Sequence, residues 1–240
     1  MNRLSEIVRF YALLEELEAK VGPRRRLSEC SGRSKWPERG VYFFFEPGEM
    51  RRDSGDGPRV VRIGTHALTT GSKSTLWGRL SQHRGGSRSG GGNHRGSIFR
   101  LLVGAALLKR DAAGAPDSWG VDTDPGKAAK RFGIERADLL RREHEIEKEV
   151  SRYIGQMDAL WLPIQDEPGP GSHRGFIERN AIALLSNANR AAVDAPSAHW
   201  LGRDSDRAAV HDSGLWNNNH TSETAAPDFL DRFSRIVAVL

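Results

Sequence analysis

Apolar residues repeat at strand and helix spacings along most of the 240-residue chain. Residues 40–45, Gly-Val-Tyr-Phe-Phe-Phe, form an unbroken run of strand-forming residues, which is typical of a strand buried on both faces. Residues 59–64 predict its partner strand, and 158–164 predict a third. The pattern therefore predicts an α/β (α+β) fold with a small mixed or antiparallel three-stranded sheet.

Helices are expected on both sides of this sheet. Residues 2–20 place apolar side chains three and four positions apart, which predicts an amphipathic packing or dimerisation helix. The helix expected at 74–83 has Ser74 or Thr75 as its N-cap. Further helices are predicted at 97–110, 136–154, 175–187 and 227–238, whereas 46–58, 84–97 and 111–128 are predicted to be loops.

Composition limits the class of protein. The apolar fraction of 38% suffices for a real core. No window of 18 apolar residues occurs, which argues against a membrane-spanning helix and a membrane partner. Acidic residues throughout the first helix argue against a signal or transit peptide. Cys30 is the single cysteine, which excludes an internal disulfide and a cysteine-based zinc site, so we expect a cytoplasmic protein.

The charge favours a nucleic-acid partner. The formal net charge is +5, and arginines cluster in 24–35, 79–100 and 130–152. Arginine suits bidentate contact with phosphate, although an arginine-rich soluble protein would show the same excess. The glycine- and serine-rich loop at 84–97 carries three arginines that we predict to contact DNA: Arg84, Arg88 and Arg95.

Four side chains could together attack a phosphodiester. Arg79 and His83 lie one turn apart on the helix that follows the second strand, Tyr42 lies in the first strand, and Glu178 lies on a later helix. Each has a structural alternative. Tyr42 could be a core residue, Arg79 a solvated cation, and Glu178 an acid favoured by the helix dipole.

In this order the residues resemble the motifs of the GIY-YIG nuclease superfamily. Gly40-Val41-Tyr42 resembles the first motif, and Arg62-Ile63-Gly64 lies where the second belongs, with Arg62 in place of its tyrosine. Arg79 with His83 matches the helix motif, and Glu178 matches the metal-binding acid. Asn187 or Asn189 could be the asparagine that follows this acid, and both are predicted to lie at the DNA.

The resemblance covers part of a single domain. The expected parts are a core at 38–84 and 157–190, an insertion at 85–156, an N-terminal helix at 1–22 and a C-terminal extension at 191–240. The literal string Tyr153-Ile154-Gly155 ends a charged helix far from Tyr42, so Tyr153 is interpreted as a packing residue. Two further patterns, around His144 and at Asn217–His220, lack the context of a metal or nuclease motif.

The resemblance implies a metal-dependent DNA endonuclease. Glu178 would hold Mg²⁺ or Mn²⁺, Tyr42 would position or deprotonate the attacking water, and Arg79 would clamp a phosphate oxygen. His83 would hydrogen-bond Tyr42 or the water, and Arg62 would add positive charge. The size of the chain and its additional helices suggest a restriction-type enzyme, which implies a homodimer making a double-strand cut.

Two alternatives remain open at this point. Arg62 could mark a decayed site, which would leave a module that binds nucleic acid without cutting it. The chain could also be a structure-specific repair nuclease, which would cleave branched or damaged DNA and not intact duplex.

Overall fold

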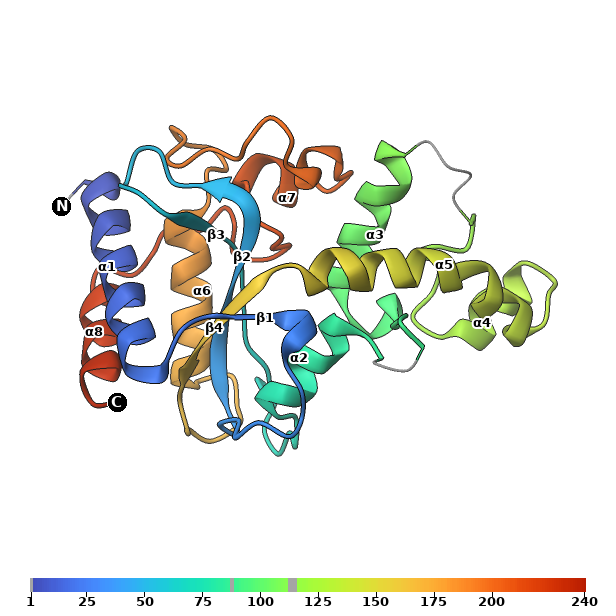
Figure 1. Cartoon of the computed structure of the whole chain (residues 1–240), viewed down its shortest axis with the longest axis horizontal. Helices are drawn as coiled ribbons and strands as arrows, with labels where there is room; N and C mark the ends of the chain where they lie inside the picture. The colour runs from blue at the N-terminus through green and yellow to red at the C-terminus, as the bar shows by residue number, and fades with distance from the viewer. Residues whose placement is uncertain (1, 87–88, 112–115) are drawn as a thin grey trace.

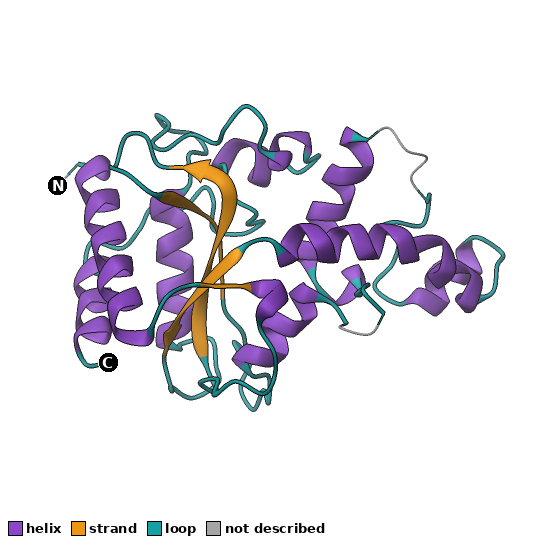
Figure 2. Cartoon of the chain, viewed as in Figure 1, coloured by secondary structure: helices purple, strands orange, loops and turns teal. Residues whose placement is uncertain are grey.

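The chain folds around a four-stranded antiparallel sheet with the strand order β1-β4-β2-β3. The computed structural model describes residues 2–86, 89–111 and 116–240. Figures 1 and 2 show the sheet standing between two groups of helices. The strands are β1 (Arg25–Arg26), β2 (Gly40–Met50), β3 (Pro58–Gly64) and β4 (Asp158–Pro163).

Helices cover both faces of the sheet (Figure 1). Helices α1, α6 and α8 lie on one face, and α2, α3 and α5 lie toward the other. None of the described helices is both long enough and apolar enough to cross a membrane. The helices are α1 (Arg3–Val21), α2 (Leu76–Arg84), α3 (Ile98–Arg110), α4 (Pro125–Arg131), α5 (Arg136–Gly155), α6 (His173–Leu185), α7 (Ala208–Ser213) and α8 (Phe229–Ala238).

The central strand β2 separates two hydrophobic clusters. Val41, Phe43 and Phe45 pack with α1, α6 and α8, whereas Tyr42 and Phe44 pack with α2, α3 and α5. Successive side chains of a strand point to opposite faces, so an unbroken apolar run requires cover on both. The prediction of a doubly buried strand is confirmed.

Three local expectations were wrong. Strand β2 continues through the expected connection to Met50, which pairs with Pro58. Helix α4 begins inside the expected loop at 111–128, because Asp124 caps it by accepting from the Lys127 N–H at 2.9 Å. Strand β1 consists of two exposed arginines paired with β4, so no apolar pattern marked it.

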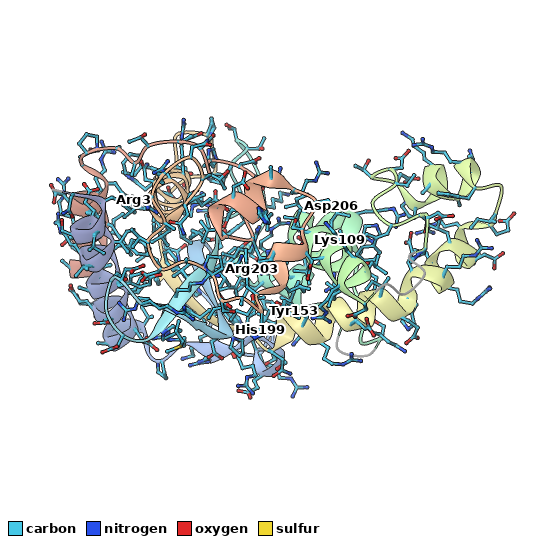
Figure 3. All side chains as sticks on the ribbon, turned by 90° about the horizontal axis from the view of Figure 1, so that it is seen from above. Arg3, Lys109, Tyr153, His199, Arg203 and Asp206 are labelled. Atoms are coloured by element: carbon cyan, nitrogen blue, oxygen red, sulfur yellow. The ribbon has the colours of Figure 1, made fainter. Side chains whose placement is uncertain are left out.

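The segments outside the expected core pack onto it. Helix α1 packs against α6 and α8, so its apolar face is used within the chain. Trp200 and Trp216 of the C-terminal extension are buried in the cluster beneath α3 and α5. Lys109 of α3 and Asp206 of this extension form an ion pair of 2.6 Å (Figure 3).

Tyr153 lies near the end of α5, as interpreted from the sequence. Its hydroxyl donates to the carboxylate of Glu46, and its ring packs edge-on against Trp216. Figure 3 shows Tyr153 on α5 close to the C-terminal extension. The Tyr-Ile-Gly string at 153–155 is therefore a helix end.

Candidate active site

Tyr42 of β2 contacts His83 of α2 on the face of the sheet that α2, α3 and α5 cover. The hydroxyl of Tyr42 lies 2.8 Å from Nε2 of His83, and both side chains are fully buried. Tyr42 is paired across the ladder with Gly64, where an added Cβ would lie 2.2 Å from the tyrosine oxygen. A glycine at this position is therefore what admits the ring of Tyr42.

Helix α2 sets the spacing of Arg79 and His83. Its N-cap is Thr75, whose hydroxyl accepts from the Gly78 N–H at 3.1 Å. Arg79 is half-buried, and its Nη1 donates to Gln82 Oε1 at 3.0 Å and to the Gly96 carbonyl at 3.3 Å. Both contacts lie in exposed positions, so a phosphate oxygen can replace them as the partner of the guanidinium.

Arg62 lies in the middle of β3 with 5% of its surface exposed. Its Nη1 donates to the Trp216 carbonyl, its guanidinium carbon lies 4.5 Å from the centroid of the Phe99 ring, and its buried Nε has no partner among the described residues. Burial lowers the pKa of Arg62, while charge on Tyr42 and Glu178 acts in the opposite direction. Arg62 is therefore an incompletely paired cation whose charge interacts with both of these residues.

Glu178 connects α6 to the end of β3. Ser172 caps α6, and Oε1 of Glu178 accepts from the Thr65 N–H at 3.1 Å, just beyond Gly64. Burial raises the pKa of the Glu178 carboxyl, although Arg62 and the Thr65 N–H oppose the shift. The carboxyl is thus held against the strand that carries Arg62.

A cavity of about 420 Å³ opens beside Glu178. Its walls include Phe176, Arg179 and Arg232, together with His220 from the C-terminal extension. His220 has a left-handed backbone, with φ of 63°, and its Nδ1 lies 2.8 Å from Glu223 Oε1. Non-glycine residues in this conformation are uncommon and often occur at functional sites.

Glu178 offers one carboxylate as a candidate ligand for a metal ion. Among the described residues, no group of three or more His, Cys, Asp or Glu side chains could hold an ion. Apart from the bond to Thr65, the described residues offer the Glu178 carboxylate no hydrogen-bond partner. One carboxylate suits Mg²⁺ or Mn²⁺, which keep most of their waters, rather than Zn²⁺, which takes three or four protein ligands. The donor set therefore fits a hydrated divalent ion.

The structure brings together Tyr42, Arg62, Arg79, His83 and Glu178, which come from β2, β3, α2 and α6. Tyr42 contacts His83 directly, and charge on Tyr42, Arg79 and Glu178 acts on Arg62. Tyr42 and His83 form its buried side, and Arg79 and Glu178 its half-buried side.

Two of the arginines expected at the DNA, Arg84 and Arg95, make contacts within the chain. Arg95 forms a bidentate ion pair with Glu143, and 3% of its side chain is exposed. Arg84 donates to the Cys30 carbonyl and lies over the ring of Trp77. Arg88 lies outside the described residues. Arg84 and Arg95 therefore make contacts within the chain, and their contact with DNA stays a prediction.

In the described part of the chain, neither Asn187 nor Asn189 forms a hydrogen bond with Glu178. Asn187 accepts from Arg3 Nη2 and from the Val193 N–H, both at 2.9 Å, beyond the C-terminal end of α6. Asn189 is exposed and has a left-handed backbone, with φ of 59°. Asn187 thus anchors the first helix to the C-terminal extension.

Sequence reasoning missed three residues around this site. Ser97 contacts His83, Asn217 contacts the backbone beside Arg62, and His220 shares the cavity with Glu178. Ser97 carried a local signal, because a serine before an apolar helix is a typical N-cap. Its contact with His83 depends on packing between segments, and no local sequence signal indicates this contact.

Comparisons with known proteins agree with this arrangement. The family described as GIY-YIG domain matches residues 1–240. No curated protein and no solved structure gives a significant match to the chain. The chain belongs to the GIY-YIG domain family, whose members are generally endonucleases that act on DNA.

Proposed function

We propose that this protein is a metal-dependent DNA endonuclease of the restriction or DNA-defence type. The observation that carries the proposal is the convergence of Tyr42, Arg62, Arg79, His83 and Glu178 from four separate elements of the fold. A buried hydroxyl, two cations and a carboxylate are the groups that phosphodiester hydrolysis requires.

Each side chain has a distinct role in this proposal. Arg79 binds a non-bridging phosphate oxygen through its planar fork, and Arg62 adds a second cation with an unpaired Nε. Tyr42, once it has lost its own proton to solvent, takes a proton from the attacking water, which then forms the new bond to phosphorus. The bond from phosphorus to the 3′ oxygen breaks, and this oxygen takes a proton from solvent.

Glu178 would hold the divalent ion. When bound there, Mg²⁺ or Mn²⁺ supplies positive charge that polarises the phosphate and stabilises the leaving oxygen. Glu178 itself needs to be ionised for this role, and the nearby Arg62 and the Thr65 N–H favour its ionised form.

The restriction-type assignment draws on the parts added to the core. Helices α3, α4 and α5 and the C-terminal extension provide surface for reading DNA beyond the small catalytic sheet. Cutting both strands of a duplex requires two active sites or two successive cuts, so a homodimer belongs to the same proposal. Sedimentation with and without DNA measures this state.

The test is cleavage of supercoiled plasmid and of modified phage DNA in Mg²⁺ or Mn²⁺. We expect discrete fragments from the native protein and none from Glu178→Ala. Glu167→Ala, which removes an exposed acid from the loop before α6, is the matched control and keeps activity. Equal cleavage by the native protein and Glu178→Ala would exclude Glu178 from the site.

A second candidate function is DNA binding without cleavage. The observation that favours it is the complete burial of the Tyr42 hydroxyl beside an arginine that replaces the expected tyrosine. It predicts that the protein shifts intact duplex on a gel in a salt-dependent manner, yet cuts no substrate with either metal.

A further inference from the structure

A chain of buried hydrogen bonds runs from the active site into the inserted segment. Tyr42 Oη lies 2.8 Å from His83 Nε2, and His83 Nδ1 lies 2.9 Å from the hydroxyl of Ser97. Ser97 is 1% exposed, and Tyr42 and His83 are fully buried. Both nitrogens of the imidazole are therefore occupied by hydroxyl groups, one from the core and one from the insertion.

The donors and acceptors around Ser97 indicate where the proton lies in the hydrogen bond between Ser97 and His83. The Ser97 hydroxyl already accepts the Arg100 N–H at 3.3 Å, because Ser97 is the N-cap of α3. Among the described residues, the one acceptor within reach of the Ser97 hydroxyl proton is His83 Nδ1. If Nδ1 carried the proton instead, the hydroxyl proton of Ser97 would be buried without an acceptor, which is costly.

The surroundings of His83 keep the ring neutral. Burial lowers its pKa well below the ordinary value of 6.5, and Arg62 of β3, Arg79 of α2 and Arg100 of α3 lower it further. The aromatic rings of Phe44 and Phe99 also pack against it. A neutral imidazole has one N–H, so a proton accepted at Nδ1 from Ser97 leaves the N–H on Nε2.

We propose that Ser97 is a positioning residue of the active site, which donates to Nδ1 of His83 and fixes the tautomer in which Nε2–H donates to the oxygen of Tyr42. His83 is then a hydrogen-bond donor to Tyr42 and not the acceptor of its proton. This inference rests on the proposed role of Tyr42 as the base.

The proton balance follows from this tautomer. With Nε2–H donating to Tyr42, the hydroxyl proton of Tyr42 has no acceptor among the described residues, so it is available to a water or phosphate oxygen that enters the site. The Tyr42 oxygen then accepts from His83 Nε2–H and lies beside the Arg62 guanidinium, so a hydrogen-bond donor and a cation both face this oxygen. In catalysis Tyr42 gives its proton to solvent and then takes one from the attacking water, so it ends the reaction as the starting phenol.

The insertion also holds the backbone of His83. Arg100 Nη1 donates to the His83 carbonyl at 2.8 Å, and its Nε donates to Glu147 Oε2 at 3.0 Å. Arg100 is fully buried. Ring and backbone of His83 are thus fixed from α3 and α5, so Ser97 meets Nδ1 at a set distance.

The direct test is the protonation state of the His83 ring by nitrogen-15 NMR of the native protein, with His83→Gln used to assign the signals. We expect a protonated Nε2 and an unprotonated Nδ1 from pH 5.5 to 8.5. A proton on Nδ1, or on both nitrogens, would overturn the proposal. This readout needs no cleavage, so it stands apart from the test of nuclease function.

Variants at position 97 supply a second test in the cleavage assay. Ser97→Thr keeps a hydroxyl donor, whereas Ser97→Asp can cap α3 but only accepts from Nδ1. We expect Ser97→Thr to retain activity, and Ser97→Asp to lose at least tenfold and to need higher pH for its remaining rate. A Ser97→Asp variant as active as the native protein, with an unchanged pH profile, would contradict the proposed tautomer. If this variant does not fold, the NMR measurement decides.

Discussion

At the scale of single residues, the close approach of Gly64 to Tyr42 decides whether the tyrosine can occupy its place. A Cβ at Gly64 would lie 2.2 Å from the Tyr42 oxygen and 2.3 Å from the ring carbon that bears it. We expect Gly64→Ala to destabilise the fold by about 1–3 kcal/mol through overpacking. Displacing the hydroxyl should also lower cleavage by roughly 100-fold, as measured in the plasmid assay.

Gly169→Ala is the matched control for this substitution. An added Cβ there would meet the Thr70 hydroxyl at 3.7 Å, which is an ordinary contact. We expect its melting temperature and cleavage rate to equal those of the native protein. Native-like cleavage by Gly64→Ala would show that the position of Tyr42 does not limit the reaction.

We predict that the Glu178 carboxylate lowers the stability of the fold, although cleavage depends on it. Burial raises the pKa of its carboxyl, so the folded protein disfavours the charged form and loses stability as the pH rises through that pKa. Glu178→Gln removes this loss and can keep the bond from Thr65. We therefore expect the metal-free variant to melt higher than the native protein at pH 7.5.

The expected gain at pH 7.5 is roughly 2–4 °C for each kcal/mol of relief. At a pH below the raised pKa, both proteins carry a neutral group at 178, so the difference should shrink. Thermal melts of both proteins across this range measure it. A variant that melts lower at pH 7.5 would mean that the carboxylate stabilises the fold through Arg62.

At the scale of elements, local patterns predicted most of the secondary structure that carries the site. The apolar run of β2 and the cap at Thr75 are encoded by neighbouring residues, and both were found from sequence. Contacts between distant segments, such as Ser97 with His83, depend on how α3 packs beside α2, and no local pattern records this. The ion pair of Arg95 has no local signal for the same reason, because its partner Glu143 lies 48 residues away.

The packing of α3 against α5 rests on a buried ion pair. Arg100 and Glu147 are 0% and 5% exposed, and Glu147 Oε1 also accepts from the His94 N–H at 2.6 Å. Glu147→Leu leaves the Arg100 cation buried without its partner, so we expect a loss of about 3–5 kcal/mol in unfolding free energy. Denaturant titration measures this loss.

The double variant Arg100→Met, Glu147→Leu separates stability from positioning. It removes both charges, so we expect it to be more stable than Glu147→Leu alone. It also removes the donor to the His83 carbonyl, so its cleavage should stay below the native level. Full recovery of cleavage by the double variant would show that Arg100 does not position His83.

At the scale of the whole molecule, the two ends of the chain complete the fold at one face and one edge of the sheet. Helices α1 and α8 lie side by side on one face (Figure 1). The extension before α8 lies along β3, at the edge of the sheet, where the Trp216 N–H donates to the Val61 carbonyl at 2.7 Å. The side chain of Asn217 continues this pairing, since it accepts from the Ile63 N–H at 3.1 Å and donates to the Ile63 carbonyl at 2.8 Å.

This pairing makes Asn217 a link between the C-terminal extension and Arg62. Asn217→Ala would leave the N–H and the carbonyl of Ile63 unpaired in a buried position, at a cost of about 1–3 kcal/mol for each group. Because the Trp216 carbonyl accepts from Arg62, loosening this segment should also release the guanidinium and lower cleavage. Asn218→Ala, which changes the exposed neighbour, should leave melting and cleavage unchanged. If Asn217→Ala melts lower but cuts at the native rate, the extension stabilises the sheet without positioning Arg62.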